Sequence, residues 1–286
     1  MARVYEPGVN ATEPPPAARL PDFLCLGAQR GGTTTLQLLL SQHPQVFLPA
    51  CKEVHYFSLQ ADRPPAWYAE HFAPAPAGAL CGEITPYYLF HPEAPARIRA
   101  LLPHARLVVL LRDPVERTLS QVFHSQQLGL EDLPLEQALA AEAERLAGAE
   151  AVLCHPSGRH RSHQEHSYLS RSRYGAQLSR YEALFPRRQL LLLRSEDLFE
   201  RPAVSWRRLQ RFLGLTRVPL PAMPRANGSG AAADQVSPLL RRSLRHQLWP
   251  TYALMQRFYG LRWPLSDPDR RWPPAASGPD DAADSR

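Results

Sequence analysis

Residues 23–36, FLCLGAQRGGTTTL, decide the fold class of this 286-residue chain. A short apolar segment from Phe23 to Gly27 is typical of a strand, and a glycine-rich loop follows it. An amphipathic helix opens near Leu36. Glycines let the backbone approach an anion, and the N–H groups and dipole of a helix start favour negative charge. The stretch therefore predicts a phosphate-binding strand, loop and helix in an α/β fold.

The kind of phosphate is indicated by a residue that is missing from this loop. Nucleoside-triphosphate loops read G-x-x-x-x-G-K-[ST], and their lysine contacts the β- and γ-phosphates. Gly27 and Gly32 have that spacing, but Thr33 stands where the lysine would be, and the cation of the loop is Arg30. The loop therefore argues against ATP or GTP and favours a single phosphate or phosphosulfate group.

A second segment, residues 106–120, has the pattern of a buried parallel strand followed by a helix. The strand RLVVLL runs into Arg112-Asp113-Pro114, and Pro114 suits a first helical turn because no N–H is needed there. Arg112 thus emerges at the carboxyl end of a strand, where open α/β sheets bind their ligands.

These two segments together resemble the sulfotransferase superfamily, whose sulfuryl donor is 3'-phosphoadenosine 5'-phosphosulfate (PAPS). Residues 29–34, QRGGTT, are similar to its 5'-phosphosulfate loop, and residues 112–120, RDPVERTLS, to its 3'-phosphate motif. Two further runs, KEVHYF at 52–57 and EITPYY at 83–88, are similar to the heparan-sulfate-type branch and its bacterial relatives. The resemblance spans roughly residues 23–264 and implies a PAPS-dependent enzyme that sulfates a hydroxyl or amine, with a carbohydrate or glycoconjugate as the expected acceptor.

The resemblance also implies roles for individual residues. Glu53 would be the general base and His55 a member of its hydrogen-bond network, while Arg30 would stabilise the leaving phosphate. Two positions in or near these catalytic residues depart from the branch: Arg30 replaces its usual lysine and Ser58 replaces an aspartate. Arginine stays protonated in proteins, so electrostatic stabilisation is expected from Arg30 rather than proton donation.

Further site residues are expected on the donor and acceptor sides. The donor side would comprise Arg30, Gly31, Gly32, Thr33, Thr34, Arg112, Ser120, Asn227 and Gly228. The acceptor side would comprise Lys52, Thr85, Tyr87 and Arg171. Arg117 is expected either to supplement the 3'-phosphate site or to pair with Glu116, and Ile84 stands where the branch has an acceptor-binding lysine, which weakens the case for a highly sulfated glycan.

Composition agrees with one soluble domain, and the alternation of strands and helices predicts an α/β fold with a central parallel sheet flanked by helices. With 44% hydrophobic residues, a mean hydropathy of −0.35 and a net charge of +6, the chain is globular and mildly basic, which suits an anionic donor. We expect a Pro-rich arm over 1–20, the domain over 21–264 and a disordered tail over 265–286. No signal peptide or apolar run of ~20 residues is seen, so a cytoplasmic protein without a nucleic-acid partner is expected, and its oligomeric state stays open.

The pattern along the chain predicts alternating strands and helices. Strands are expected over 23–27, 79–85, 106–111 and 189–193. Helices are expected from 36 to about 43 and over 67–72, 92–102, 133–146, 168–185, 204–213 and 237–259, with a further helix beginning at Pro114. Residues 150–165 and 219–236 are expected to be loops.

One cluster in the expected 150–165 loop and just beyond it invites a metal-site interpretation. Cys154, His155, His160, His163 and His166 are of the types that bind zinc, but Arg159, Arg161 and Arg171 lie beside them and would repel a cation. We expect no metal, and either a solvated loop or a cationic lid. Cys25 and Cys81 are expected to be reduced core thiols, and nothing in the sequence favours a Cys51–Cys154 disulfide.

Two functions therefore remain open on the sequence alone. One is a PAPS-dependent sulfotransferase. The other is a non-catalytic nucleotide-anion binding module or sensor on the same fold, which the departures at Arg30 and Ser58 would fit.

Overall fold

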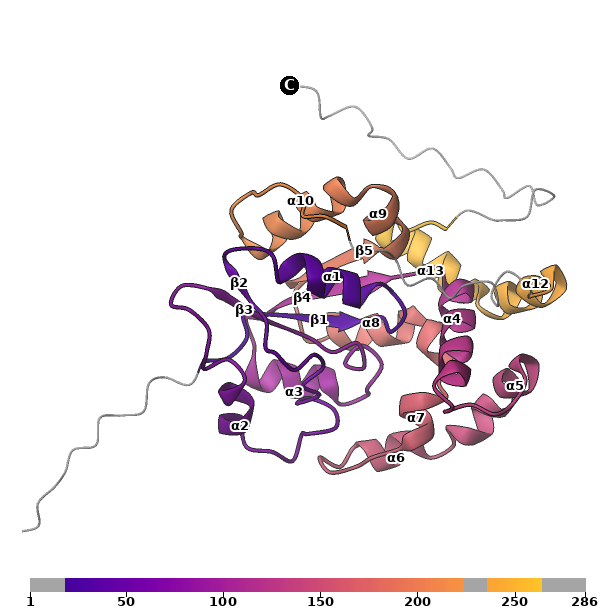
Figure 1. Ribbon diagram of the computed structural model, residues 1–286. Coiled ribbons are helices and arrows are strands. Elements are labelled where there is room, and N and C mark those ends of the chain that lie inside the picture. The colour runs from indigo at the N-terminus through magenta and orange to yellow at the C-terminus, as the bar shows by residue number, and fades with distance from the viewer. Residues whose placement is uncertain (1–18, 224–235, 264–286) are drawn as a thin grey trace, which may run out of the picture.

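A five-stranded, all-parallel sheet lies at the centre of the described part of the protein, residues 19–223 and 236–263 of a computed structural model (Figure 1). The strand order is β2-β3-β1-β4-β5. The strands are β1 (Phe23–Gly27), β2 (Val46–Phe47), β3 (Leu80–Ile84), β4 (Arg106–Leu111) and β5 (Leu190–Arg194). The predicted α/β class with a parallel sheet is confirmed.

Helices connect the strands and extend the chain beyond the sheet. They are α1 (Thr33–Leu40), α2 (Pro65–Glu70), α3 (Ala94–Leu101), α4 (Pro114–Gln127), α5 (Leu135–Arg145), α6 (Ala149–Leu153), α7 (Arg161–Glu165), α8 (Tyr174–Glu182), α9 (Ser195–Glu200), α10 (Pro202–Leu213), α12 (Pro238–Gln247) and α13 (Trp249–Tyr259). Short 3-10 turns lie at Ser170–Ser172 and Arg187–Gln189.

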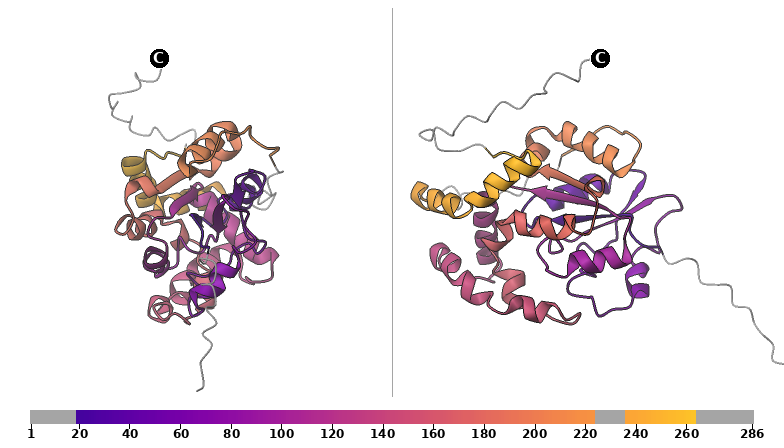
Figure 2. Two further views of the ribbon diagram at one scale, coloured as in Figure 1. Left: turned by 90° about the vertical axis from the view of Figure 1, so that its left-hand side faces the viewer. Right: turned by 180° about the vertical axis from the view of Figure 1, so that it is seen from behind.

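The alternation of side chains along β1 divides the core between the two faces of the sheet. Phe23 and Cys25 pack into one cluster with residues of α1 and α10, while Leu24 and Leu26 pack into another with residues of α3 and α8. All four side chains are fully buried. Figures 1 and 2 show α1 and α10 on one face and α3 and α8 on the other. A strand buried on both faces is the reason for its continuous apolar sequence.

The order of strands places the two motif-bearing loops side by side. β1 pairs with β3 on one side and with β4 on the other, and Gly27 lies opposite Val109 of β4. Because both strands are parallel, the loop after β1 and the residues after β4 meet at the carboxyl edge of the sheet. Ligands of open α/β sheets bind at such a switch point.

The structure differs from the sequence-based expectation in four places. β2 and α9 were not predicted, because β2 has two residues and α9 has six, and such short elements carry little periodic signal. Residues 150–165 hold α6 and α7 rather than a plain loop. The long helix expected over 237–259 is two helices, since Pro250 cannot continue a helix and instead occupies the first turn of α13.

Several expectations lie outside the described residues. These are most of the Pro-rich arm, the tail after residue 263, and the donor residues Asn227 and Gly228. The division into an arm, a domain and a tail accordingly stays a prediction. The core thiols are confirmed: Cys25 and Cys81 are buried, and all four cysteines are free.

Candidate donor and general-base site

The loop between β1 and α1 is packed so closely against β4 that glycine is required at position 31. A Cβ on Gly31 would lie 2.8 Å from the carbonyl oxygen of Leu110 and 2.9 Å from that of Ala28. Gly32 has a φ of 93°, which glycine adopts without strain. α1 then begins at Thr33 with no capping side chain and no acid in its first turn. Its N-terminal N–H groups therefore remain available to an anion.

Two arginines, one from each motif, interact electrostatically with each other. Arg30 donates from Nε to the hydroxyl of Ser120 at 3.1 Å. Burial, and then the charge of Arg112, lower the pKa of Arg30 below its ordinary value. Within residues 19–223 and 236–263, neither guanidinium forms an ion pair with an acid. Two cations held together without a carboxylate make a site for an anion.

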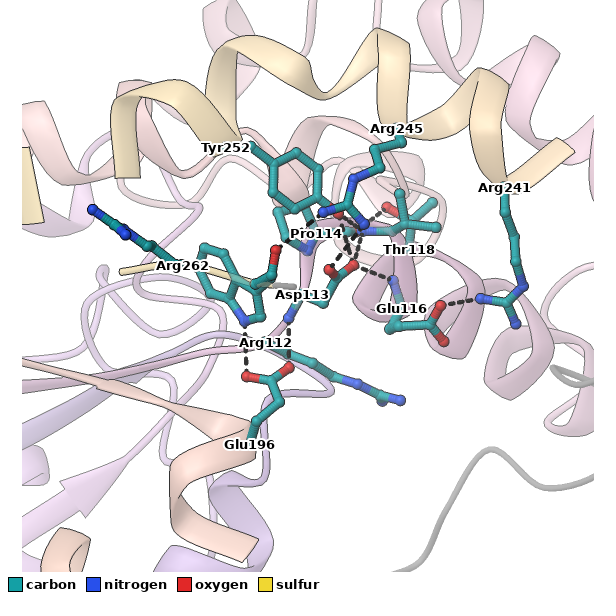
Figure 3. Close-up of polar contacts among 12 residues, drawn as sticks. Arg112, Asp113, Pro114, Glu116, Thr118, Glu196, Arg241, Arg245, Tyr252 and Arg262 are labelled. Carbon is teal, nitrogen blue, oxygen red and sulfur yellow. Dashed lines mark hydrogen bonds and ion pairs between the residues drawn. The ribbon is translucent and has the colours of Figure 1, made fainter. Parts of the chain in front are cut away.

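The direction of Arg112 follows from how its backbone is held. Its carbonyl accepts a hydrogen bond from the hydroxyl of Tyr174 at 2.8 Å, and the next N–H, that of Asp113, donates to Glu196 at 2.8 Å. Figure 3 shows the Arg112 side chain extending away from the carboxylates of both Asp113 and Glu196. Asp113 also caps α4 by accepting from the N–H groups of residues 115 and 116.

Glu53 lies between a cation and an imidazole. Its Oε1 is 3.3 Å from Nζ of Lys52, and its Oε2 is 3.5 Å from Nε2 of His55. Lys52 also donates at 2.9 Å to the hydroxyl of Thr34. Thr34 is the exposed threonine of residues 29–34, which are called the donor loop below. The candidate base is thereby joined through Lys52 to the donor loop.

The electrostatics of Glu53 keep it charged. Burial alone raises the pKa of a carboxyl, but the hydrogen bond from His55 and the charge of Lys52 outweigh it, so that the pKa of Glu53 is lowered. His55 is oriented in turn by Ser58, whose buried hydroxyl lies 3.0 Å from Nδ1. Ser58 thus contacts His55 from the position where the resembling branch has an aspartate.

The backbone is strained at the three predicted catalytic residues. Arg30, Glu53 and His55 have φ values of 66°, 62° and 60°, and no other non-glycine residue of the described ranges has a positive φ. This conformation costs an L-residue roughly 1–2 kcal/mol. Strain of this kind persists where the surrounding structure enforces it, and it gathers at functional sites.

Three of the four predicted acceptor residues, Thr85, Tyr87 and Arg171, are buried. Thr85 is fully buried and donates to Glu83 at 2.6 Å, and its role toward an acceptor stays a prediction. Tyr87 shares a hydrogen bond with His163 at 2.8 Å. The guanidinium of Arg171 lies over the Tyr87 ring at 4.9 Å and donates to Gln29 of the donor loop. Tyr87 and Arg171 therefore join the acceptor side to the donor loop.

Glu83 is a buried carboxyl that the sequence motif contained but to which no role was assigned. It accepts hydrogen bonds from the hydroxyls of Thr85, Tyr88 and Tyr68, and burial raises its pKa despite these donors. The Tyr88 hydroxyl also accepts from the N–H of Phe57, two residues after His55. Its place in the quoted motif EITPYY was the available signal, although only other residues of that motif received a role.

Arg117 and the histidine-rich segment have structural surroundings. Arg117 is fully buried and donates to Ser172, Gln121 and the carbonyl of Tyr168, so it neither joins the 3'-phosphate site nor pairs with Glu116. Each of the four histidines between 155 and 166 has its own hydrogen-bond partner, which for His160 is the backbone N–H of His163. In the described ranges, no group of three or more His, Cys, Asp or Glu side chains is placed to hold a metal ion. A metal-free reaction stays a prediction.

Comparison with known proteins assigns a family to this fold and site. The family model of the sulfotransferase domain matches residues 20–219. Human heparan sulfate glucosamine 3-O-sulfotransferase 3B1 is 33% identical over 201 residues, which cover 70% of this chain and 47% of that protein. Membrane-associated sulfotransferase kil1 of Dictyostelium discoideum is 40% identical over 111 residues, covering 38% of this chain and 24% of its own length.

Solved structures agree with this assignment. A sulfotransferase from Alicyclobacillus acidocaldarius superposes with a TM-score of 0.69 at 26% identity, covering 83% of this chain and 95% of that one. Mouse sulfotransferase SULT7A1, complexed with PAP, superposes with a TM-score of 0.50 at 11% identity over 84% of this chain and 85% of its own, which shows the shared fold. The chain belongs to the sulfotransferase family. It spans about half the length of the human heparan sulfate relative that it matches.

Proposed function

We propose that this protein is a PAPS-dependent sulfotransferase that transfers a sulfuryl group to a hydroxyl or amine of a carbohydrate or glycoconjugate. One observation carries the proposal. The base Glu53 is joined through Lys52 to Thr34 at the start of α1, which is the helix whose free N-terminus faces Arg30 of the donor loop. A base and an anion site in one connected unit suit group transfer better than anion binding alone.

The donor's two anionic ends fit the two cations. The 5'-phosphosulfate would lie on the loop of Gly31 and Gly32, where a Cβ at position 31 would collide with β4. The 3'-phosphate would lie between Arg112 and the hydroxyl of Ser120. When bound, the donor supplies the activated sulfuryl group and a phosphate leaving group.

The chain's own residues would then do two things in the reaction. Glu53 would accept the proton of the acceptor hydroxyl, held in place by His55 and Lys52. Arg30 would stabilise the charge that develops on the leaving phosphate, as preorganised cations do in phosphoryl transfer. Because Arg30 stays protonated, this stabilisation requires no proton transfer.

The heparan sulfate relatives support a carbohydrate acceptor, and the likeness in fold to a PAP-complexed enzyme supports the donor. A cytoplasmic location, a metal-free reaction and independence from nucleic acid form part of the same proposal. In the residues that the structure describes, no helix is both long and apolar enough to cross a membrane.

The test is turnover of sulfur-labelled PAPS with a panel of hydroxylated and amino acceptors, including unsulfated and sulfated oligosaccharides. A labelled product whose formation requires Glu53 supports the proposal. If the protein binds the donor but no acceptor is labelled, and Glu53→Gln changes nothing, the non-catalytic sensor is the better description.

A further inference from the structure

The segment after residue 236 contacts the 3'-phosphate motif, although it lies beyond the residues that the sulfotransferase family model matches. The hydroxyl of Tyr252 in α13 donates to Oδ1 of Asp113 at 2.8 Å. A guanidinium nitrogen of Arg245 in α12 lies 3.9 Å from the other carboxylate oxygen. Figure 3 shows both side chains reaching the start of α4 beside Arg112.

This contact matters because Asp113 is the acid adjacent to Arg112. Its side-chain oxygen caps α4, and its negative charge opposes any phosphate that Arg112 binds. A positive charge close to the Asp113 carboxylate, supplied from outside the motif, would offset its repulsion of the phosphate. Arg245 is in the position to do so, and its side chain is 15% exposed, so solvent screens the pair only partly.

Arg245 itself is held in that position by neighbours on two elements. Its guanidinium stacks over the ring of Tyr252 at 4.4 Å, and it donates to the carbonyl of Trp263 at 3.1 Å. The Trp263 indole donates at 2.8 Å to Glu196, the acid that receives the N–H of Asp113. The segment 236–263 thus contacts Asp113 directly and also Glu196, the acid that accepts from the Asp113 N–H.

Two other arginines of this region, Arg194 and Arg241, already lie close to acids other than Asp113. Arg194 lies 3.8 Å from Glu196 and 3.7 Å from Asp197, and Arg241 pairs with Glu116 on the first turn of α4. Among the ion pairs of the described ranges, Asp113 pairs with Arg245 alone.

We propose that Arg245 is a positioning residue that neutralises Asp113 and thereby preserves the affinity of Arg112 for the donor's 3'-phosphate. This inference rests on the proposed function. It extends the donor site to α12 and α13, and it predicts that Arg245 acts on one phosphate of the donor and not on the other.

The experiment compares two ligands that differ by the 3'-phosphate. Dissociation constants of adenosine 3',5'-bisphosphate and of adenosine 5'-monophosphate are measured by calorimetry for the wild type, Arg245→Gln and Arg257→Gln. Arg257→Gln is the matched control, because Arg257 is an exposed arginine of α13 that stacks on Phe258. We expect Arg245→Gln to raise the dissociation constant of the bisphosphate about tenfold and to leave that of the monophosphate nearly unchanged. Arg257→Gln should change neither dissociation constant.

A second variant shows whether the effect passes through Asp113. Asn caps helices as well as Asp does, so Asp113→Asn removes the charge and keeps the cap. In the Asp113→Asn background, Arg245→Gln should have little further effect on the bisphosphate. An equal loss for both ligands, no loss, or full additivity in the double variant would overturn the proposal. If the wild type does not prefer the bisphosphate at all, the proposed function fails instead.

Discussion

Arg30 donates a hydrogen bond to Ser120 across 3.1 Å, although the two residues are ninety positions apart in the chain. One comes from the loop after β1 and the other from the helix after β4. This bond shows that the two anion-binding motifs face one another in a single site. A ligand that uses both motifs would carry one anionic group for each of them, at neighbouring positions.

The first prediction follows from that spacing. Adenosine 3',5'-bisphosphate should stabilise the protein, whereas ATP, which has no 3'-phosphate and meets no Walker lysine, should do so weakly. A ligand that binds only the folded state adds ~2.7 kcal/mol to the free energy of unfolding at ~100 times its dissociation constant. Thermal unfolding at matched concentrations measures this. Equal shifts for the two nucleotides would contradict the two-phosphate site.

The second prediction concerns the base. Glu53→Gln keeps the size of the side chain and removes its ability to take a proton. Turnover should fall roughly 10²–10⁴-fold, with the donor dissociation constant nearly unchanged. Single-turnover kinetics alongside calorimetry separate the two quantities. Near-normal turnover in a folded variant would place the base elsewhere, with His55 as the next candidate.

The third prediction uses the pKa of Glu53. That pKa lies below its ordinary value of 4.5, and after burial, which opposes the shift, the hydrogen bond from His55 is the largest cause. A base works when deprotonated, so kcat/KM should fall as the pH drops through the lowered pKa. His55→Ala removes the hydrogen bond, and the acid limb should move to higher pH.

Ser58→Ala is the control for this experiment. Ser58 contacts His55 and not Glu53, so the substitution leaves the contacts of Glu53 with Lys52 and His55 in place. Its acid limb should move less than that of His55→Ala. An acid limb that stays fixed in His55→Ala would show that another group titrates.

The fourth prediction distinguishes the two arginines. Arg112 would touch a phosphate that is unchanged throughout the reaction, so Arg112→Ala should chiefly raise the donor KM. Arg30 would face the bond that breaks, so Arg30→Ala should lower kcat; the loss would correspond to about 2.7–4 kcal/mol of transition-state stabilisation if it resembles the loss of one oxyanion donor. Arg30→Lys should retain more activity than Arg30→Ala. Steady-state kinetics with varied donor test this, and the opposite split would reverse the orientation of the donor.

The fifth prediction concerns Gly31. A methyl group there would meet the carbonyl oxygen of Leu110 at 2.8 Å. Gly31→Ala should therefore lower the free energy of unfolding by about 1–3 kcal/mol and weaken the binding of the bisphosphate. Gly78→Ala is the comparison: its Cβ would meet nothing within 4 Å, and only its φ of 77° is unfavourable. It should destabilise the fold while leaving ligand affinity intact, as denaturant unfolding and calorimetry would show.

The sequence was sufficient for the parts of the site that lie in continuous motifs. The β1 loop, the strand before Arg112 and the run around Glu53 each carry a local signal, in glycine, in apolar length or in charge. The structure brings these three segments to one edge of the sheet, because parallel strands present their carboxyl ends together.

The remainder depended on contacts that no local pattern encodes. Asp113 was readable as a helix cap, but its partners Tyr252 and Arg245 lie more than a hundred residues further along the chain. Thr85 sits in a recognisable motif, yet its direction is set by Glu83 within the core. Burial and side-chain direction depend on the packed structure rather than on spacing.

Lys52 has one more consequence. It is the only lysine in the sequence, and its amine bonds to the donor loop through Thr34. An amine-acylating reagent therefore has a single lysine target in this sequence, and the reactivity of that lysine reports on the surroundings of Thr34. The extent of Lys52 acylation, read by mass spectrometry, becomes a footprint of ligand occupancy that needs no acceptor and no turnover.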